Sequence, residues 1–146
     1  MARRNSYKLL DLPIDSDRSL SRLEPYFLQY DQEQWRKGSG GGLLQIEIDG
    51  IEYSLTIGED PRFGILLEYS IKRGAGKPGW ESWYSVGKMQ LMNDFEETPT
   101  EMVMPVGAYI APADAWKAVQ EFDANPEFLP ASVQWLASAS ISWPEM

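Results

Sequence analysis

The sequence predicts an α+β fold, with a mainly antiparallel sheet of about five to seven strands packed with two helices in a single domain of residues 1–146. Three observations lead to this prediction. Apolar residues alternate with polar ones on both sides of the Asp49-Gly50 pair, which is a strong hairpin signal. The segment after Pro112 has the apolar spacing of a helix. A length of 146 residues with 43% hydrophobic and 24% charged residues is typical of one globular domain.

The first predicted element is a helix over residues 10–30. Its apolar stripe consists of Leu20, Leu23, Phe27 and Tyr30. Its candidate N-cap residues are Asp15, Ser16 and Asp17. A proline beyond the first turn of a helix costs ~3 kcal/mol. The helix is therefore expected either to begin near Glu24, with Pro25 at its first position, or to break there.

A glycine-rich segment, Gly38-Ser39-Gly40-Gly41-Gly42, follows and predicts a flexible, mobile loop. A phosphate-binding loop would continue with lysine and serine or threonine, whereas Leu43 and Leu44 come next. The segment is therefore interpreted as a connector without a phosphate site.

Four strands are predicted in the middle of the chain. Leu44 to Ile57 form the hairpin around Asp49-Gly50, and Ile65 to Ile71 form a third strand. After a glycine-rich loop, Trp80 to Gly87 form a fourth, and Met89 to Met92 are expected to add a short fifth strand.

The C-terminal part begins with an acidic loop, Asp94 to Thr100, followed by an extended segment, Met102 to Val106. A helix then opens at Pro112, because proline suits the first turn of a helix, and ends at Asn125-Pro126. Its apolar side comprises Ala115, Trp116, Ala118, Val119 and Phe122. A final strand over Ser132 to Trp135 closes the fold.

The sequence contains no histidine and no cysteine, which excludes Ser-His-Asp and Cys-His catalysis and the usual zinc sites. A glycosidase-like carboxylate pair would have to come from Glu47, Asp49, Glu52 and Glu68. Glu47 and Asp49 alternate with an apolar face, however, which favours solvated strand positions. The 94–97 segment lacks the spacing and the central glycine of an EF-hand loop. We therefore expect no enzyme, no metal and no cofactor.

Charge is distributed unevenly along the chain. Residues 1–88 carry 13 acidic and 12 basic residues, whereas residues 89–146 carry nine acidic residues and one basic residue, Lys117. Such an acidic half repels nucleic acid and attracts basic partners. Because no apolar run approaches the ~18–20 residues that span a bilayer, and the N-terminus lacks a signal-peptide core, we expect a cytoplasmic protein without a membrane segment.

Two groups of residues are candidates for binding a partner. The first is the acidic group Asp94, Phe95, Glu96, Glu97 and Glu101. The second is the aromatic group Trp80, Trp83 and Tyr84. Each group also has a purely structural interpretation. Phe95 would point inward between solvated acids, and the rings would belong to the core, with Trp80 and Tyr84 on one face of their strand and Trp83 on the other.

The order of elements from Ile65 onward resembles a known family. Leu66-Leu67-Glu68-Tyr69 precedes Trp83-Tyr84-Ser85-Val86-Gly87, and Met104-Pro105-Val106 precedes Ala118-Val119-Gln120-Glu121-Phe122. Val133-Gln134-Trp135 ends the series. Over about residues 43–136 this order resembles the first immunity-protein family of bacterial polymorphic toxin systems. In this chain, residues 125–130 replace what is usually a shorter glycine-containing turn.

The resemblance implies a small α+β antitoxin of interbacterial competition. Such a toxin inhibitor acts by protein–protein interaction in the cytoplasm and blocks one cognate toxin sterically. The toxins of this family are typically nucleic-acid deaminases, and an acidic inhibitor is complementary to the basic cleft that such an enzyme needs. The family has no catalytic residues. The alternative is an acidic adaptor or secretion chaperone that recruits a basic or disordered segment.

Overall fold

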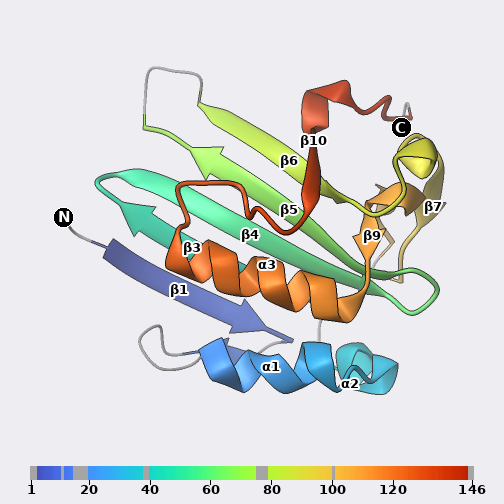
Figure 1. Cartoon of the computed structure of the whole chain (residues 1–146), viewed down its shortest axis with the longest axis horizontal. Helices are drawn as coiled ribbons and strands as arrows, with labels where there is room; N and C mark the ends of the chain where they lie inside the picture. Colours follow the sequence, from blue (N-terminus) through green and yellow to red (C-terminus); the bar gives the residue numbers. More distant parts are fainter. Residues whose placement is uncertain are drawn as a thin grey trace.

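The chain folds as an antiparallel sheet with its longest helix against one face, which is the α+β arrangement that the sequence predicts (Figure 1). The computed structural model describes residues 3–10, 12–14 (backbone only), 20–37, 40–74, 79–99 and 101–144.

The strands are β1 (Arg3–Leu9), β2 (Leu12–Ile14), β3 (Gly41–Ile48), β4 (Ile51–Asp60), β5 (Gly64–Lys72), β6 (Trp80–Val86), β7 (Phe95–Glu97), β8 (Val103–Pro105), β9 (Tyr109–Ile110) and β10 (Gln134–Ala137). The helices are α1 (Leu20–Leu28), α2 (Gln32–Lys37) and α3 (Pro112–Ala124), with short 3-10 helices η1 (Met89–Leu91), η2 (Val106–Ala108) and η3 (Ser138–Ser140). Among the described residues, eight strands form the main sheet, in the order β10-β6-β5-β4-β3-β1-β2 with β9 beside β5. β7 and β8 form a separate pair.

The predicted hairpin is confirmed as β3 and β4. Asp49 (φ 52°) and Gly50 (φ 84°) both adopt the left-handed conformation, as a type I′ turn requires. The pairing runs from Ile48 with Ile51 to Gly41 with Gly58. The alternate apolar residues of both strands are buried on one face of the sheet, which leaves the polar positions on the other.

The third, fourth and final strands are confirmed as β5, β6 and β10, although β10 begins at Gln134, two residues later than predicted. The short fifth strand expected over Met89 to Met92 is wrong, because η1 occupies these residues. The amides of Gly87 and Lys88 donate to the Gly107 carbonyl, so the chain turns away from the sheet after β6. The single helical turn then places the Met92 side chain in a small core with Tyr84 and Ala108.

The predicted C-terminal helix is confirmed as α3, with Pro112 at its N-terminus and Asn125 after its end. All five residues of its predicted apolar side are buried. The Trp116 ring lies 5.6 Å from Phe27 of α1, and the Phe122 ring lies 6.1 Å from Tyr69 of β5. α3 therefore joins the sheet to α1, and the main core lies between them.

The helix predicted over residues 10–30 is wrong at Leu12–Ile14, which form β2, and Pro25 neither begins nor breaks the helix that follows. β1 ends at Leu9, and α1 begins at Leu20 and includes Pro25. β2 pairs with β1, from Tyr7 with Ile14 to Leu9 with Leu12, and this pairing outweighs the local helical pattern. Within α1, the burial of Leu23 and Phe27 on either side of Pro25 offsets the backbone hydrogen bond that the proline removes. The predicted caps Asp15, Ser16 and Asp17 lie outside the described residues.

The prediction of a mobile glycine loop is also wrong for the part of the segment that the structure describes. Gly41 and Gly42 belong to β3, while Gly38 and Ser39 lie outside the described residues. A Cβ atom on Gly41 would lie 2.4 Å from the Ile57 carbonyl oxygen. These glycines therefore allow the close approach of neighbouring backbone instead of providing a flexible connection.

This packing can be tested with two glycine-to-alanine variants. A Cβ on Gly42 would lie 2.6 Å from Leu9 Cδ1 and 2.7 Å from the Lys8 carbonyl oxygen, so Gly42→Ala is expected to lower the free energy of unfolding. Overpacking of this kind costs about 1–3 kcal/mol. Gly58→Ala is the matched control, since no atom lies within 4 Å of its Cβ position. Urea unfolding of both variants measures the difference, and equal stabilities would contradict the packing argument.

Candidate functional site

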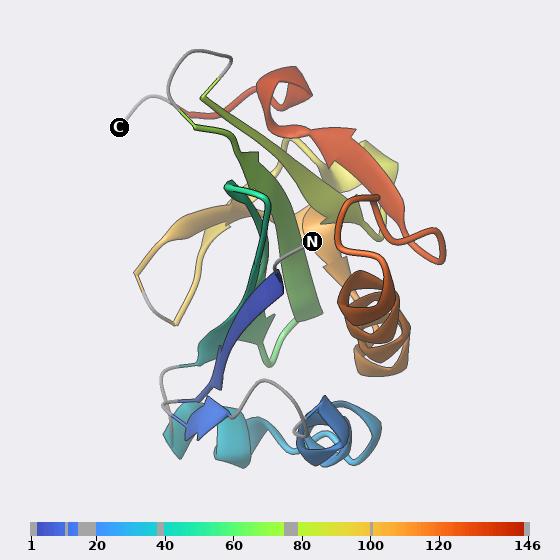
Figure 2. The same cartoon turned by 90° about the vertical axis from the view of Figure 1, so that its left-hand side faces the viewer.

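The β7–β8 hairpin lies on the face of the sheet opposite α3 (Figure 2). Phe95 pairs with Pro105 and Glu97 with Val103. The predicted acidic loop is thus partly a strand, and the predicted extended segment pairs with it. The Thr98 amide donates to the Met102 carbonyl at 2.7 Å, next to the end of the hairpin.

A pocket of about 320 Å³ lies between this hairpin and the sheet. On the sheet side, Thr56, Glu68 and Tyr84 stand directly opposite one another across β4, β5 and β6. The hairpin contributes Met102 and Met104. The other lining residues are Gly40, Gly41, Ile57, Gly58, Glu59, Leu66, Thr98 and Tyr109. A volume of this size is at the lower end of the range for small-ligand pockets.

Glu68 is the half-buried carboxylate of this pocket. Burial raises the pKa of Glu68 above its usual range, and the neighbouring hydroxyls of Ser82 and Tyr84 oppose this effect only in part. No cation of the described residues forms an ion pair with it. The solvated interpretation applies to Glu47 and Asp49: Asp49 is exposed in the turn and Glu47 is partly exposed beside Arg4, whereas Glu68 is half-buried in the pocket.

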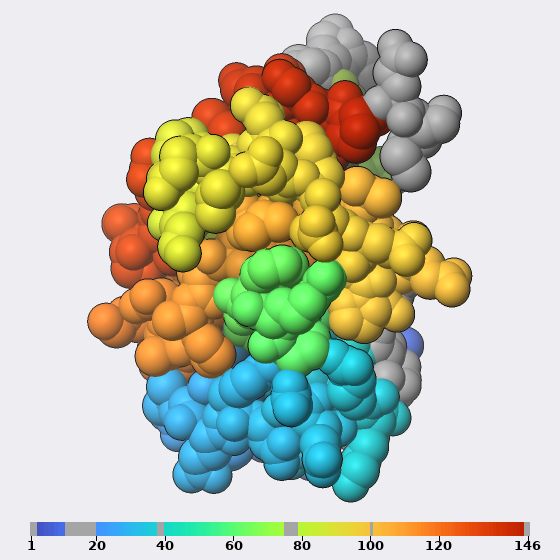
Figure 3. Space-filling view, turned by 90° about the vertical axis from the view of Figure 1, so that its right-hand side faces the viewer, coloured from blue at the N-terminus to red at the C-terminus, as the bar shows by residue number. Residues whose placement is uncertain are grey.

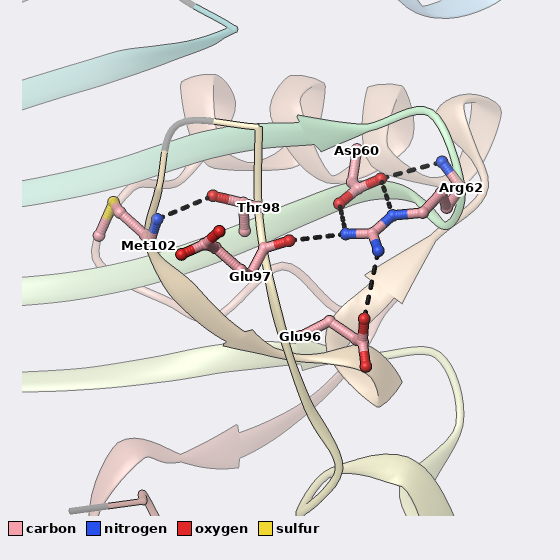
Figure 4. A network of polar contacts seen from close by, with 6 residues as sticks. All are labelled: Asp60, Arg62, Glu96, Glu97, Thr98 and Met102. Carbon is pink, nitrogen blue, oxygen red and sulfur yellow. Dashed lines mark hydrogen bonds and ion pairs between the residues drawn. The ribbon is translucent and has the colours of Figure 1, made fainter. Parts of the chain in front are cut away.

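Arg62, in the turn between β4 and β5, connects the hairpin to the sheet (Figure 4). Its guanidinium donates to both carboxylate oxygens of Asp60, at 3.0 and 2.7 Å. It also donates to Glu96 Oε1 at 3.2 Å and to the Glu97 carbonyl oxygen at 2.7 Å. Figure 3 shows this turn, in green, between the α1–α2 region and the segment that contains the hairpin. One side chain thus holds the acidic strand in place.

Asp60 makes this anchor rigid, because its side chain is almost completely buried. Burial alone would raise the pKa of Asp60, but the hydrogen bonds and charge of Arg62 outweigh it and hold the pKa below its usual range. The adjacent carboxylate, Glu59, accepts a hydrogen bond from the Tyr30 hydroxyl. Burial raises the pKa of Glu59, and this hydrogen bond opposes the rise.

Aromatic rings support the base of the hairpin. Trp143 lies 5.6 Å from the Phe95 ring and 5.3 Å from the Tyr84 ring. The Val106 amide donates a hydrogen bond to the Asp94 carbonyl oxygen, with an N···O distance of 2.7 Å. Phe95 therefore packs inward, as the structural interpretation of this segment expects, while the strand beyond it remains exposed.

The predicted acidic residues are all placed on or beside the hairpin. Asp94, Glu96, Glu97 and Glu101 are exposed. Glu96 pairs with Arg62, and Glu101 has a left-handed backbone (φ 65°). The structure thus places these four exposed acids within one segment, on β7 and at the ends of the hairpin.

The predicted aromatic residues divide between the two faces of β6, as their spacing predicts. Trp80 is 58% exposed and lies on the same face as the hairpin. Tyr84 is buried at the inner end of the pocket. Trp83 faces the helix-covered side, where its ring lies 5.7 Å from Tyr69. The site therefore includes Trp80 and Tyr84 but not Trp83.

Sequence reasoning missed three contributors to this surface: Arg62, Met102 and Trp143. Met102 and Trp143 are exposed by 53% and 38%. The sequence did offer one signal for the pocket. Glu68 is a charged residue in the otherwise apolar run Leu66-Leu67-Glu68-Tyr69, which marks a strand position that is neither core nor fully solvated. Arg62 has no comparable signal, because its contacts depend on a segment 34 residues away.

The site offers charged and apolar surface for binding. Within the part of the chain that the structure describes, no group of three or more aspartates and glutamates is arranged to hold a metal ion. None of the helices described is both long enough and apolar enough to cross a membrane. Comparisons with protein-family models, with curated proteins and with solved structures find no match to this chain.

The unusual position of Glu68 predicts a pH-dependent stability. Because burial raises its pKa in the folded state, the folded chain retains this proton to a higher pH than the unfolded chain does. Stability is therefore lost as the pH rises from the unfolded pKa, about 4.3, through the folded pKa. Glu68→Gln is expected to raise Tm at neutral pH, and the gain should shrink as the pH falls toward about 4.

Calorimetry at several pH values measures this effect. The other titratable residues that line the pocket are Glu59, Tyr84 and Tyr109. They are present in both proteins, so their contribution to the pH dependence of Tm cancels in the comparison. Glu33→Gln, an exposed change on α2 with the same change in charge, serves as the control and should leave Tm nearly unchanged. A Glu68→Gln protein that is less stable than the unsubstituted chain at neutral pH would contradict the prediction.

The Arg62 anchor predicts the mobility of the hairpin. Arg62→Ala removes both hydrogen bonds to β7, so the Thr98 and Glu101 amides are expected to exchange with solvent ~10-fold faster or more. Arg62→Lys keeps the charge but loses the planar fork and should give an intermediate rate. Hydrogen exchange measured by NMR tests this. Arg73→Ala, which breaks the separate pair with Glu81, is the control and should not accelerate exchange in the hairpin.

Proposed function

We propose that this chain is an immunity protein, which binds a cognate bacterial toxin and neutralises it sterically, the toxin being one that acts on nucleic acid, such as a deaminase. The resemblance over about residues 43–136 and the net charge of −9 both favour this function. The proposal depends chiefly on one observation, which is that exposed apolar side chains and unpaired acids share the face of the sheet that carries the hairpin.

The apolar members of this face are large and exposed. Trp80, Met102 and Trp143 all stand on it, and Leu43 of β3 adds a fourth side chain that is 37% exposed. Apolar anchors surrounded by polar residues are typical of protein–protein interfaces, and tryptophan is enriched among their energetic hot spots. This composition supports a protein partner.

The acidic members supply the matching charge. Among the described cations, none pairs with the side chains of Asp94, Glu97 or Glu101, so these carboxylates remain available for a partner. An enzyme that acts on nucleic acid needs a basic substrate cleft, and opposite fields accelerate association. An acidic hairpin held firmly by Arg62 is suited to enter such a cleft.

Co-expression provides the direct test. If the chain is an immunity protein, its gene should lie immediately downstream of a toxin gene. Cells that produce this toxin should survive when they also produce this chain, and the two proteins should copurify. If the chain binds the neighbouring protein but does not protect cells from it, the adaptor or chaperone alternative is supported instead. Failure of both binding and protection would contradict the proposal.

The role of the acidic group can be tested by charge reversal that spares the anchor. The triple change Asp94→Lys, Glu97→Lys and Glu101→Lys keeps Glu96 on Arg62, and it is expected to slow association ~10-fold or more at low salt and to weaken its salt dependence. Stopped-flow or surface-plasmon measurements at several salt concentrations give the rate. The control is Glu24→Lys, Glu33→Lys and Glu127→Lys, three exposed acids on other elements, and equal rates for the two triple variants would exclude the hairpin as the contact.

A further inference from the structure

The pocket beneath the hairpin has the form of a site for one long side chain. Its inner surface is formed by the central strands, where Glu68 lies between Thr56 and Tyr84. Its walls are apolar and come from both sides, with Leu66 and Tyr109 near the sheet and Met102 and Met104 from the hairpin. A ligand that enters it would therefore meet apolar surface and two carboxylates, that of Glu59, which accepts the Tyr30 hydroxyl, and that of Glu68.

No cation of the described residues pairs with the Glu68 carboxylate. Asp60, the other deeply placed acid nearby, has the fork of Arg62, and Glu59 accepts the Tyr30 hydroxyl. Glu68 has only the neighbouring hydroxyls of Tyr84 and Ser82. Covering an ionised carboxylate with a neutral group would leave it desolvated and unpaired, which is unfavourable. A cation is the occupant that this site accommodates best.

Among cations, a guanidinium on an aliphatic stem fits the walls. Arginine packs its methylene groups along apolar surface while its charged end reaches further, and it loses hydration more easily than lysine does. Its planar group can also lie over a tyrosine ring, and Tyr84 and Tyr109 both line the pocket. A metal ion is less suitable, because the described residues offer no cluster of ligands.

We propose that this pocket receives one arginine side chain of the partner protein, whose guanidinium pairs with the Glu68 carboxylate beneath the β7–β8 hairpin. This inference rests on the proposed function, since it identifies the residue type through which the toxin is held. The exposed acids of the hairpin guide the basic partner to this face, and Glu68 then fixes its register through one ion pair inside the pocket.

The first test uses the whole chain and a small probe. Acetyl-arginine methylamide is titrated into protein labelled at its methionine methyl groups, and the NMR signals of Met102 and Met104 are followed. A saturable shift is expected in the unsubstituted chain and in Glu33→Gln, and its loss is expected in Glu68→Gln. The citrulline analogue has the same shape without the charge and should not saturate. Equal behaviour of the two probes, or of Glu68→Gln and the unsubstituted chain, would overturn the proposal.

A second variant guards against a fold defect in Glu68→Gln. Thr56 is exposed and lies directly opposite Glu68 on β4, so Thr56→Lys places an internal cation beside the carboxylate. This variant should remain folded by circular dichroism and should lose the arginine shift by competition. An undiminished shift in a folded Thr56→Lys chain would contradict the pairing with Glu68.

The second test uses the neighbouring toxin and separates this inference from the proposed function. Glu68→Gln is expected to weaken toxin binding ~30-fold or more, because one partner of a buried charge pair is removed. Protection by the unsubstituted chain together with undiminished toxin affinity in Glu68→Gln would overturn the arginine site while leaving the immunity function intact. If the unsubstituted chain binds the free arginine probe with micromolar affinity while Glu68→Gln keeps its full affinity for the toxin, the pocket is a site for small cations instead.

Discussion

The alternation of side chains along the central antiparallel strands is the constraint on which the rest of this structure depends. In β5, Leu67 and Tyr69 face the helices, whereas Leu66 and Glu68 face the hairpin. A shift of one residue in register would exchange the two faces and bury Glu68 in the main core. Because α1 and α3 already cover one face, whatever binds the other has to meet the polar positions of the same strands. The core and the candidate site are thus two consequences of one register.

A second level of organisation comes from Arg62. β7 and β8 pair with each other apart from the main sheet, and contacts of the Arg62 side chain hold this hairpin over the sheet. The Asp60 carboxylate accepts two hydrogen bonds from the Arg62 guanidinium. The same guanidinium donates to Glu96 and to the Glu97 carbonyl of β7. A buried carboxylate within the main sheet therefore determines where an exposed acidic strand stands. This arrangement fixes the hairpin over the pocket in the chain alone, so the binding proposed above would order fewer residues and lose less entropy.

The distribution of acids has a structural meaning beyond the net charge of −9. Some carboxylates are already used inside the molecule, as Asp60 and Glu81 are in their pairs with arginine. Others, among them Glu97 and Glu101, stand free of ion pairs with the described cations on the hairpin. Glu68 differs from both groups, since it is partly desolvated and yet lacks a cation among the described residues. For a binding protein, exposed acids act on the rate of encounter, whereas a desolvated acid acts on the specificity of the final contact.

The sequence by itself determined the elements whose signals are local. Neighbouring residues specify the Asp49-Gly50 turn, the alternation on both sides of it and the helix that begins at Pro112. Turn geometry and helical spacing depend on only a few consecutive positions. Its spacing also separated Trp80 from Trp83 correctly. Only the tertiary structure decided that Leu9 lies in a strand, that Gly41 and Gly42 are packed, and that Glu68 is partly buried. Each of these depends on pairing with a distant segment, whose burial and hydrogen bonds outweigh local preference.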